Sequence, residues 1–516
     1  MSDSRGTTQA GPEQMQGTGT RFGFPEKVLT AFLCGSIALW TVQCSLLQNV
    51  LSIDIYEAII WGQQAQWGYA KHPPLSGWLG YAFSWAAGHR DWGIYFAAQL
   101  CIGIGVFFAY LLARQFFDRY KAAAAALLPY FLFYLTPSET KFSTYFVEMA
   151  LAPAASYFLL RALRENRVWQ WLTLGALCGL GMLNKYSFGL TMLGFALIVL
   201  SSREYRRRLA SPGPYLAGIV LVLIFLPHLV WLVRHNFVCL RHVAYRLEDT
   251  HSPLMPLIVL ATGLYPLVSG ALVMLIALFP GFRREEDSAG LWENYRKLAG
   301  WEHEPRNFEA ARFGLILTLT PGLAYFLLSL TGQDIILMWL CPTGFWSGIA
   351  ILALCPVRAD RKLFARIAIL LGIFIAGMFA ATTADLLINT RTSLHLDRDE
   401  VIRQALAVWR KQRGDEKIPL AVGNFRAVGI INHYLPYHPP ACEPDNDTMI
   451  DLYRETLRSS GALLIDKSET ELRKFTSRLN TPVKLEKCTL YYKAPCGRKR
   501  RWTFHVGVLP PGTEVK

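Results

Sequence analysis

The run VLTAFLCGSIALWTVQCSLL occupies residues 28–47 and contains no charged side chain. A helix needs about 20 consecutive apolar residues to cross the hydrocarbon core of a bilayer, so this run predicts a transmembrane helix. Residues 1–25 are rich in Gly, Thr and Gln, and we expect them to form a disordered cytoplasmic tail. They lack the apolar core and small-residue cleavage site of a secretory signal, so no removed signal peptide is expected.

The same length criterion predicts eleven transmembrane spans and an all-α multi-pass membrane protein. The composition agrees, since 52% of the residues are hydrophobic and 17% are charged, whereas soluble chains carry about a quarter charged residues. That hydrophobicity excludes a disordered chain, and 10 Cys in 516 residues exclude a disulfide-built scaffold. The ten spans after the first are expected at about 92–113, 121–136, 143–161, 169–183, 187–201, 214–233, 254–281, 312–331, 335–355 and 363–388.

The net charge of +14 follows mainly from the connections between the spans. With the N-terminus in the cytoplasm, the five inside connections hold twenty Lys and Arg residues, and the five outside connections hold seven. An excess of basic residues on the cytoplasmic side orients membrane proteins, so we expect this topology, with the C-terminus outside. A nucleic-acid partner is not expected, because basic residues would then cluster on a water-exposed fold.

The end of the chain, residues 390–516, has no spanning run and predicts a small α/β domain outside the membrane. Its expected helices are Asp399–Lys411 and Thr448–Ser459, the second followed by the short apolar run Ala462–Ile465, and its expected strands are Leu420–Val422, Asn480–Tyr492 and Trp502–Val508. The cysteines at 442, 488 and 496 permit either one disulfide or free thiols. The predicted organisation is therefore a tail (1–25), a transmembrane domain (26–389) with a first outside connection (49–91), and this C-terminal domain.

The first outside connection carries the most informative polar residues. Asp54 and Glu57, three residues apart, are expected on one face of a helix that emerges from the membrane. Lys71 and His72 follow, and the next two residues are prolines that fix φ and stiffen the chain. A lysine at the membrane surface is well suited to hold a phosphate as a point charge.

The remaining candidates are charged residues where the membrane disfavours them. Basic residues on the outside oppose the orientation signal, so we expect some to bind a phosphate or carboxylate of a substrate, although ordinary snorkelling side chains are the alternative. Glu148 is the one acid well inside a span, which indicates a functional carboxylate or a structural partner for a neighbouring polar group. His228 is expected to be a hydrogen-bonded interior histidine. The outside basic residues besides Lys71 include Lys141, Lys185, Arg234, Arg241 and Arg246.

These motifs together resemble those of the bacterial members of glycosyltransferase family 39, the protein-mannosyltransferase-like group that includes the lipid A aminoarabinose transferase. The similarity extends over about residues 30–510, and the segment from Asp54 to His72 is its most specific part. Within the family, the sequence most resembles a rhizobial subgroup that includes lipid A and core galacturonosyltransferases. Its other motifs are Lys71-His72-Pro73-Pro74-Leu75, Asn184-Lys185-Tyr186-Ser187, Pro227-His228-Leu229-Val230-Trp231, Met338-Trp339-Leu340-Cys341-Pro342 and Tyr434-Leu435-Pro436-Tyr437-His438-Pro439-Pro440.

The resemblance implies a GT-C fold in a bacterial inner membrane, with a periplasmic domain and a cavity at the outer membrane face. It implies an inverting transfer of a sugar from a polyprenyl-phosphate carrier to lipid A or lipopolysaccharide core. Asp54 would be the general base and Glu148 a second catalytic acid. No metal or cofactor is implied, because Ala70 stands where some relatives have an acidic residue before the lysine. The implied substrate-binding residues are Glu57, Lys71, His72, Lys141, Lys185, Tyr186, Arg241 and Arg246.

Three alternatives remain beside this hypothesis. A transporter of polyprenyl-linked sugars would show polar residues at the membrane midplane in two corresponding halves, and no internal repeat is evident. A family member that glycosylates protein would share the same donor, and an inactive scaffold would not need the outside lysines. Basic residues beyond those that one phosphate requires would suit a donor sugar with its own carboxylate, such as galacturonic acid.

Overall fold

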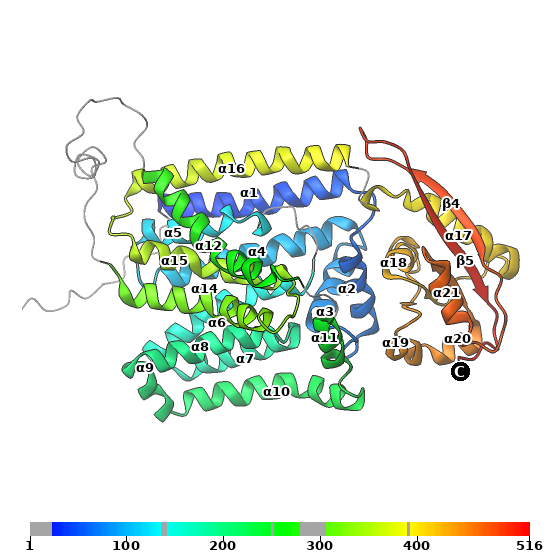
Figure 1. Ribbon diagram of the computed structural model, residues 1–516, viewed down its shortest axis with the longest axis horizontal. Helices are drawn as coiled ribbons and strands as arrows, with labels where there is room; N and C mark the ends of the chain where they lie inside the picture. The colour runs from blue at the N-terminus through cyan, green and yellow to red at the C-terminus, as the bar shows by residue number, and fades with distance from the viewer. Residues whose placement is uncertain (1–22, 136–141, 249–251, 279–305, 390–392, 516) are drawn as a thin grey trace, which may run out of the picture.

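A bundle of long helices and a smaller α/β unit at one end of it make up the protein (Figure 1). The computed structural model describes residues 23–135, 142–248, 252–278, 306–389 and 393–515. The bundle contains α1 (Phe24–Leu47), α4 (Asp91–Ala113), α5 (Arg119–Leu127), α6 (Thr144–Glu165), α7 (Val168–Asn184), α8 (Phe188–Ser201), α10 (Gly213–Arg234), α12 (Met255–Leu278), α14 (Phe308–Ser329), α15 (Gly344–Leu354) and α16 (Arg361–Ile388).

Eight segments of the described chain are long and apolar enough to cross a membrane: α1, α4, α6, α10, α12, α14, α16 and residues 337–354, where the 3₁₀ helix η5 (Leu337–Thr343) precedes α15. The predicted count of eleven spans is therefore not confirmed. The other three apolar runs fold as helices that are too short, with 17 residues in α7, 14 in α8 and 9 in α5. Helix α5 ends where the chain tightens into a 3₁₀ turn that contains Pro129.

Close helix packing in the bundle depends on small residues. A Cβ atom at Gly105 of α4 would overlap the carbonyl oxygen of Met149 in α6, and one at Gly175 of α7 would overlap Ala217 in α10. Small side chains let membrane helices approach closely, which is a main source of packing energy where lipid supplies no hydrophobic drive. Helix α6, which carries Glu148, thus packs closely against α4, and helix α7, which ends just before Lys185, packs closely against α10.

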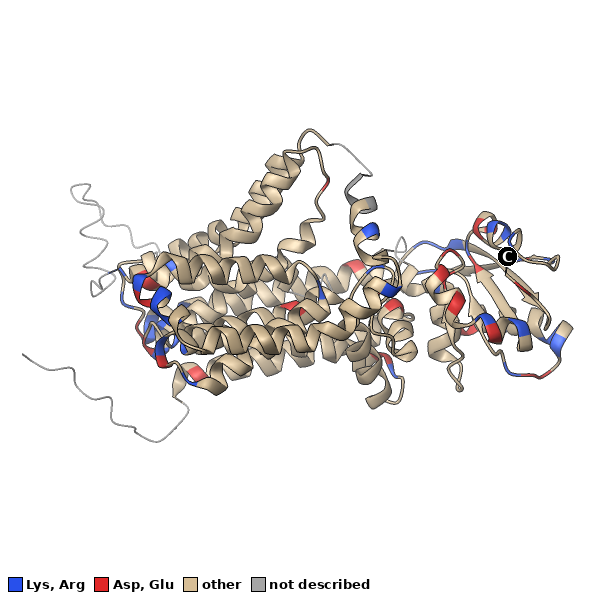
Figure 2. Ribbon diagram, turned by 90° about the horizontal axis from the view of Figure 1, so that it is seen from below, with Lys and Arg blue, Asp and Glu red and all other residues tan. Residues whose placement is uncertain are grey.

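Charged residues lie mainly at the two ends of the bundle and on the α/β unit, and the middle of the bundle is almost free of them (Figure 2). Such a distribution is required of helices whose outer surface faces hydrocarbon, because a charge at the membrane centre is costly. The chain is a multi-pass membrane protein, as predicted.

The first outside connection is largely helical. Helices α2 (Ile53–Gln64) and α3 (Leu75–Ala86) pack against each other at the end of the bundle that faces the α/β unit (Figure 1). Asp54 and Glu57 both lie on α2, as their spacing predicted. Helix α11 (Val238–Glu248), which the sequence analysis did not predict, lies at the same end.

The C-terminal unit is a five-stranded mixed sheet with helices, in agreement with the predicted small α/β fold. The strand order is β2-β1-β3-β5-β4, in which β1 is parallel to β2 and β3, and β5 is antiparallel to β3 and β4. Its strands are β1 (Ala421–Val422), β2 (Ala441–Cys442), β3 (Ala462–Asp466), β4 (Glu486–Tyr492) and β5 (Arg500–Leu509). Its helices are α17 (Arg398–Arg413), α18 (Phe425–Tyr434), α19 (Asp447–Leu452), α20 (Arg454–Ser460) and α21 (Glu469–Thr476).

Helix α18 fixes the C-terminal unit against α2. A Cβ atom at Gly429 would overlap the ring of Tyr56, which is fully buried. Gln63 of α2 donates a hydrogen bond to the carbonyl oxygen of His438 (2.8 Å), and Asn432 donates one to the Gln63 side chain (2.7 Å). All cysteines of the unit are free thiols in the structure. These contacts pack the C-terminal unit against α2, the helix that carries Asp54 and Glu57.

Candidate active site

A cavity of about 470 Å³ opens at the end of the bundle, next to α2. Its lining comes from α2, the Lys71-His72 segment, the start of α6, the turn after α7, α11, α14, and η5 with the residue before it. Six of the ten predicted site residues line it: Asp54, Glu57, Lys71, His72, Lys185 and Tyr186. Leu328, Ile336 and Met338 give it an apolar side as well.

Asp54 stands in the first turn of α2, where the backbone N–H groups and the helix dipole favour a negative charge. A hydrogen bond stabilises this turn, because the Tyr56 hydroxyl accepts from the backbone N–H of Leu51 (3.1 Å). Within the described ranges, the Asp54 carboxylate has neither a hydrogen bond nor an ion pair. It therefore faces the cavity as an acceptor that is available to a substrate hydroxyl.

Lys71 is held by the second acid of α2. Its Nζ lies 2.7 Å from Oε2 of Glu57 and 5.1 Å from the ring centre of Phe425, which belongs to the C-terminal unit. The two charged side chains are 26% and 14% exposed. Burial raises the pKa of Glu443, also in the C-terminal unit, to about 8, and the nearby Lys71 opposes this rise. The C-terminal unit thus contributes to the environment of Lys71.

Lys185 lies in an aromatic cage. Its ammonium group is 3.8 Å from the ring centre of Tyr145 and 5.4 Å from that of Trp339, and the residue is 6% exposed. The Nζ atom has no hydrogen-bond partner among the described residues. Asn184 fixes the turn by donating to the carbonyl oxygen of Thr144 (2.8 Å). A buried ammonium without a hydrogen bond is a strong site for an anionic oxygen.

Glu148 lies beneath the cavity rather than in its wall. It is 3% exposed and accepts a hydrogen bond from the Ser187 hydroxyl (3.2 Å). It lines a small adjoining cavity that shares Ser187, Tyr325 and Trp339 with the larger one. Glu148 therefore binds Ser187 and interacts electrostatically with Lys185, but it does not line the large cavity where a substrate would bind.

Tyr186 is positioned by a chain of hydrogen bonds. Its hydroxyl is 2.7 Å from Nε2 of His228, whose Nδ1 is 2.7 Å from the carbonyl oxygen of Trp67. His228 is fully buried, as expected for an interior histidine. The sequence analysis did not anticipate that it connects Tyr186 to the Lys71 segment. Trp61 stacks on Tyr69 and meets His72 edge-on at 6.0 Å, which fixes the other end of that segment.

The other predicted basic residues are not brought to the cavity by the described structure. Arg241 is exposed on α11, whereas its neighbours His242 and Val243 line the cavity, because successive helical residues point about 100° apart. Arg241 is therefore not among the residues that line the cavity. The side chain of Arg246 and the whole of Lys141 lie outside the described residues.

The residues that the sequence analysis missed are mostly aromatic or apolar. Tyr145 and Trp339 cage Lys185, and Tyr325 and His242 line the cavity from α14 and α11. Aromatic residues are abundant in the chain, so neither spacing nor charge distinguished these ones. Within the part of the chain that is described, no three His, Cys, Asp or Glu side chains converge in a way that would hold a metal ion.

The comparisons with known proteins agree with this architecture. Residues 71–231 match the family model described as dolichyl-phosphate-mannose-protein mannosyltransferase. The lipopolysaccharide core galacturonosyltransferase RgtA of Rhizobium johnstonii is 27% identical over 212 residues, which is 40% of this chain and 41% of that protein. The undecaprenyl phosphate-α-4-amino-4-deoxy-L-arabinose arabinosyl transferase 2 of Pseudomonas fluorescens is 32% identical over 164 residues, 30% of this chain and 27% of that protein. The chain thus aligns with less than half the length of these relatives.

The fold is shared over nearly the whole chain. The crystal structure of ArnT from Cupriavidus metallidurans bound to undecaprenyl phosphate superposes with a TM-score of 0.58 and 13% identity, and covers 93% of this chain and 97% of that one. This similarity confirms the GT-C fold that the sequence predicted. Together with the family match, it also confirms the resemblance to the family 39, protein-mannosyltransferase-like group.

Proposed function

We propose that this chain, a GT-C protein related to the protein-mannosyltransferase-like group, is an inverting glycosyltransferase. It would transfer a sugar from a polyprenyl-phosphate carrier to lipid A, lipopolysaccharide core or a similar glycolipid. The relatives' names support both substrates, since one acts on lipopolysaccharide core and another is named for an undecaprenyl-phosphate sugar. The proposed active site is the cavity around Asp54.

One observation carries the proposal: two lysines and a carboxylate that has no partner among the described residues line one cavity beside the membrane-spanning helices. In an inverting transfer, a base removes the proton of the acceptor hydroxyl while that oxygen attacks the anomeric carbon. The bond between this carbon and the carrier phosphate breaks on the opposite face, and the phosphate leaves with the electron pair. Asp54 is suited to be the base, and the lysines are suited to stabilise the phosphate.

The two lysines differ in how readily they can take up a phosphate. Lys185 has no hydrogen bond with any described residue to give up, whereas Lys71 must exchange its contact with Glu57. We therefore assign the principal phosphate contact to Lys185 and a supporting contact to Lys71. The apolar side of the cavity, which includes Leu328 and Met338, fits the first isoprene units of the carrier.

Glu148 is proposed to act through its neighbours. A buried carboxylate close to Lys185 favours the charged form of that lysine, and its bond to Ser187 fixes the turn that bears both Lys185 and Tyr186. In this assignment Glu148 is a positioning residue, and Asp54 is the only carboxylate that needs to reach the acceptor. Glu57 and His72 hold and orient the Lys71 segment.

Galacturonic acid is the proposed donor sugar. Lys185 alone would meet the need of a single phosphate, so Lys71, whose phosphate contact is only a supporting one, would also bind the carboxylate of the sugar in the same cavity. The name of the rhizobial relative supports the same sugar. The excess of basic residues on one set of connections supports a cytoplasmic N-terminus and a periplasmic C-terminal unit in a bacterial inner membrane.

The direct test is transfer by the purified protein in detergent. Polyprenyl-phosphate galacturonic acid is offered with a lipid A–core acceptor, and the acceptor is analysed by mass spectrometry for the added hexuronic acid. Polyprenyl-phosphate aminoarabinose and mannose are offered in parallel to decide the donor. Loss of transfer in Asp54→Asn, with the wild type active, is expected. Activity of Asp54→Asn equal to that of the wild type would exclude the proposed base.

A further inference from the structure

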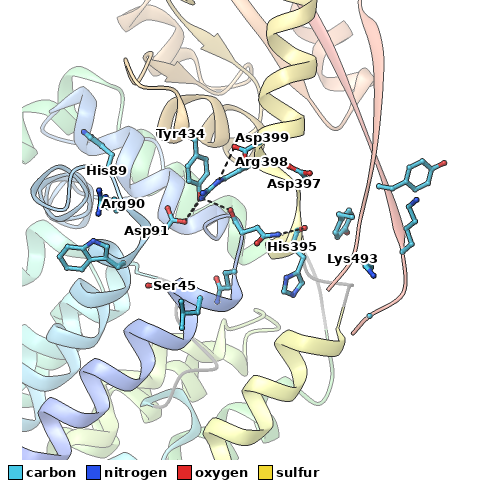
Figure 3. Close-up of a pocket in the computed structure, with 18 residues that line it drawn as sticks. Ser45, His89, Arg90, Asp91, His395, Asp397, Arg398, Asp399, Tyr434 and Lys493 are labelled. Atoms are coloured by element: carbon cyan, nitrogen blue, oxygen red, sulfur yellow. Dashed lines mark hydrogen bonds and ion pairs between the residues drawn. The ribbon is translucent and has the colours of Figure 1, made fainter. Parts of the chain in front are cut away.

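A second and larger cavity, of about 1200 Å³, lies where the bundle meets the C-terminal unit (Figure 3). Its walls are the ends of α1 and α4 nearest that unit, His395 and Asp397 just before α17, the start of α17, and the connection between β4 and β5. No residue lines both cavities, but they flank the same short segment: Asn49 lines the second cavity and Asp54 lines the first. The second cavity therefore adjoins the proposed base without being part of its site.

The acidic residues of this cavity are already engaged. Asp91 is 3.0 Å from Nε2 of His433, 3.1 Å from the Tyr434 hydroxyl and 3.4 Å from Arg398. Figure 3 shows Asp91, Arg398 and Tyr434 close together on one wall. Asp397 accepts the backbone N–H of Glu400 as the N-cap of α17. Asp399 lies 3.9 Å from Arg398. Arg398 thus pairs with Asp91 and Asp399, and the N-terminus of α17 binds Asp397, so each of the three carboxylates has a partner.

Three basic residues of the same cavity lack such partners. Arg90, Lys493 and Lys499 are exposed, and within the described structure none of them forms an ion pair. Lys499 lies 4.8 Å from the ring centre of Tyr491. His395 adds a buried polar group, since it is 3% exposed and its Nε2 has no hydrogen-bond partner among the described residues. The cavity therefore offers unused donors and positive charge to an anionic ligand.

The cavity continues into an apolar groove along the membrane-spanning helices. This groove, of about 550 Å³, lies between α1 and α16 and is lined by Leu39, Val42 and Phe379 among others. Leu46 lines both the groove and the cavity. At the boundary, Trp92 is 45% exposed, as expected of an aromatic residue at the membrane–water interface. A cationic cavity that opens into an apolar groove has the shape of an amphiphile with an anionic headgroup.

We propose that this cavity and groove hold the acceptor glycolipid, with an acyl chain in the groove and its phosphate- or carboxylate-bearing sugars in the cavity. The proposal rests on the proposed function. The volume favours a glycolipid over a phospholipid, because it exceeds the roughly 300–1,000 Å³ of sites for drug-sized ligands and a phosphoglycerol headgroup would leave most of it empty. Exposed faces of Trp92 and Tyr491 also suit sugar rings. An acceptor held here would present a headgroup hydroxyl toward the Asp54 end of α2.

The test is a triple substitution of the unpaired cations, Arg90→Ala/Lys493→Ala/Lys499→Ala. A basic residue near an anionic lipid surface contributes roughly a fivefold factor in affinity, so the KM for the lipid A–core acceptor is expected to rise by about tenfold to a hundredfold. The KM for the polyprenyl-phosphate donor is expected to stay unchanged. The matched control is Lys467→Ala/Lys474→Ala/Lys484→Ala, which removes the same charge from exposed positions that do not line the cavity.

An unchanged acceptor KM in the cavity variant, or an equal rise in the control variant, would overturn the proposal. Binding is also measured without catalysis, by native mass spectrometry of the detergent-solubilised protein with the lipid A–core acceptor or with phosphatidylglycerol. Loss of glycolipid binding in the cavity variant alone supports the site even if no transfer is detected, which separates this proposal from the proposed function. Equal loss of phosphatidylglycerol binding would show a general anionic-lipid site and would refute the assignment to the acceptor.

Discussion

The most informative single substitution is Lys185→Met, which keeps the length of the side chain and removes its charge. The ammonium group is buried, is 3.8 Å from the ring centre of Tyr145, and has no hydrogen-bond partner among the described residues. If it binds the leaving phosphate, its charge acts directly on the developing anion, while the Glu148 carboxylate, which interacts with it electrostatically, forms no ion pair with it among the described residues. Met fills the same aromatic cage, so the substitution tests charge rather than packing.

The expected magnitude follows from this geometry. Two unit charges about 4 Å apart interact by about 4 kcal/mol at an effective dielectric constant of 20. That energy corresponds to a factor of about a thousand in rate, since each 1.36 kcal/mol is tenfold. Removal of one group that stabilises an oxyanion costs about 100- to 1000-fold in kcat. We therefore expect kcat/KM for Lys185→Met to fall by a factor in that range, mostly through kcat.

The assay is transfer of labelled sugar from the polyprenyl-phosphate donor by purified protein, with the donor concentration varied. Lys185→Arg, which retains the charge, is expected to keep much more activity, and Lys467→Met serves as a control that removes an exposed lysine of the C-terminal unit. Thermal unfolding is compared with that of Lys185→Met/Glu148→Gln, which also removes the buried acid. A loss below about threefold in a folded Lys185→Met protein would refute the assigned phosphate contact, because a buried charge cannot act so weakly.

Three further results are expected. Lys71→Ala lowers kcat/KM by about tenfold, because its ammonium is partly exposed and already bound to Glu57, and an unchanged value would remove it from the site. Gly429→Ala lowers stability by about 1–3 kcal/mol in thermal unfolding, since its Cβ would overlap Tyr56; equal unfolding temperatures would contradict the close α2–α18 contact. Glu443 has a pKa raised from 4.5 to about 8, so the folded state keeps a proton that the unfolded state loses, and stability falls as pH rises between these values. Glu443→Gln is expected to abolish that slope in unfolding temperature, and an identical slope in both proteins would refute it.

The charged and proline-rich parts of the site could be predicted from the sequence because membranes restrict where charge is allowed. Lys71 and Lys185 are basic residues on the side where the orientation signal disfavours them, and Asp54 shares one face of a helix with Glu57 where the chain leaves the membrane. The structure places all three around one cavity. Arg241 met the same criterion but faces away, because the criterion identifies the side of the membrane and not the face of a helix.

The parts that could not be predicted depend on long-range packing. The cage of Tyr145 and Trp339 joins residues almost two hundred positions apart, and no local pattern distinguishes them from other aromatic residues. The predicted span count was not confirmed for a related reason, since hydropathy detects apolar runs but not where a helix breaks, as at Pro129. The short strands β1 and β2, two residues each, are defined by parallel pairing rather than by their own sequence.

The measurement that tests the central claim most directly is mass spectrometry of lipid A and core from a strain that lacks this protein. The strain is complemented with the wild type or with Asp54→Asn at equal protein levels. We predict that one sugar is missing in the deletion strain, that the wild type restores it, and that Asp54→Asn does not. Restoration by Asp54→Asn, or an envelope glycolipid unchanged by the deletion, would contradict the account.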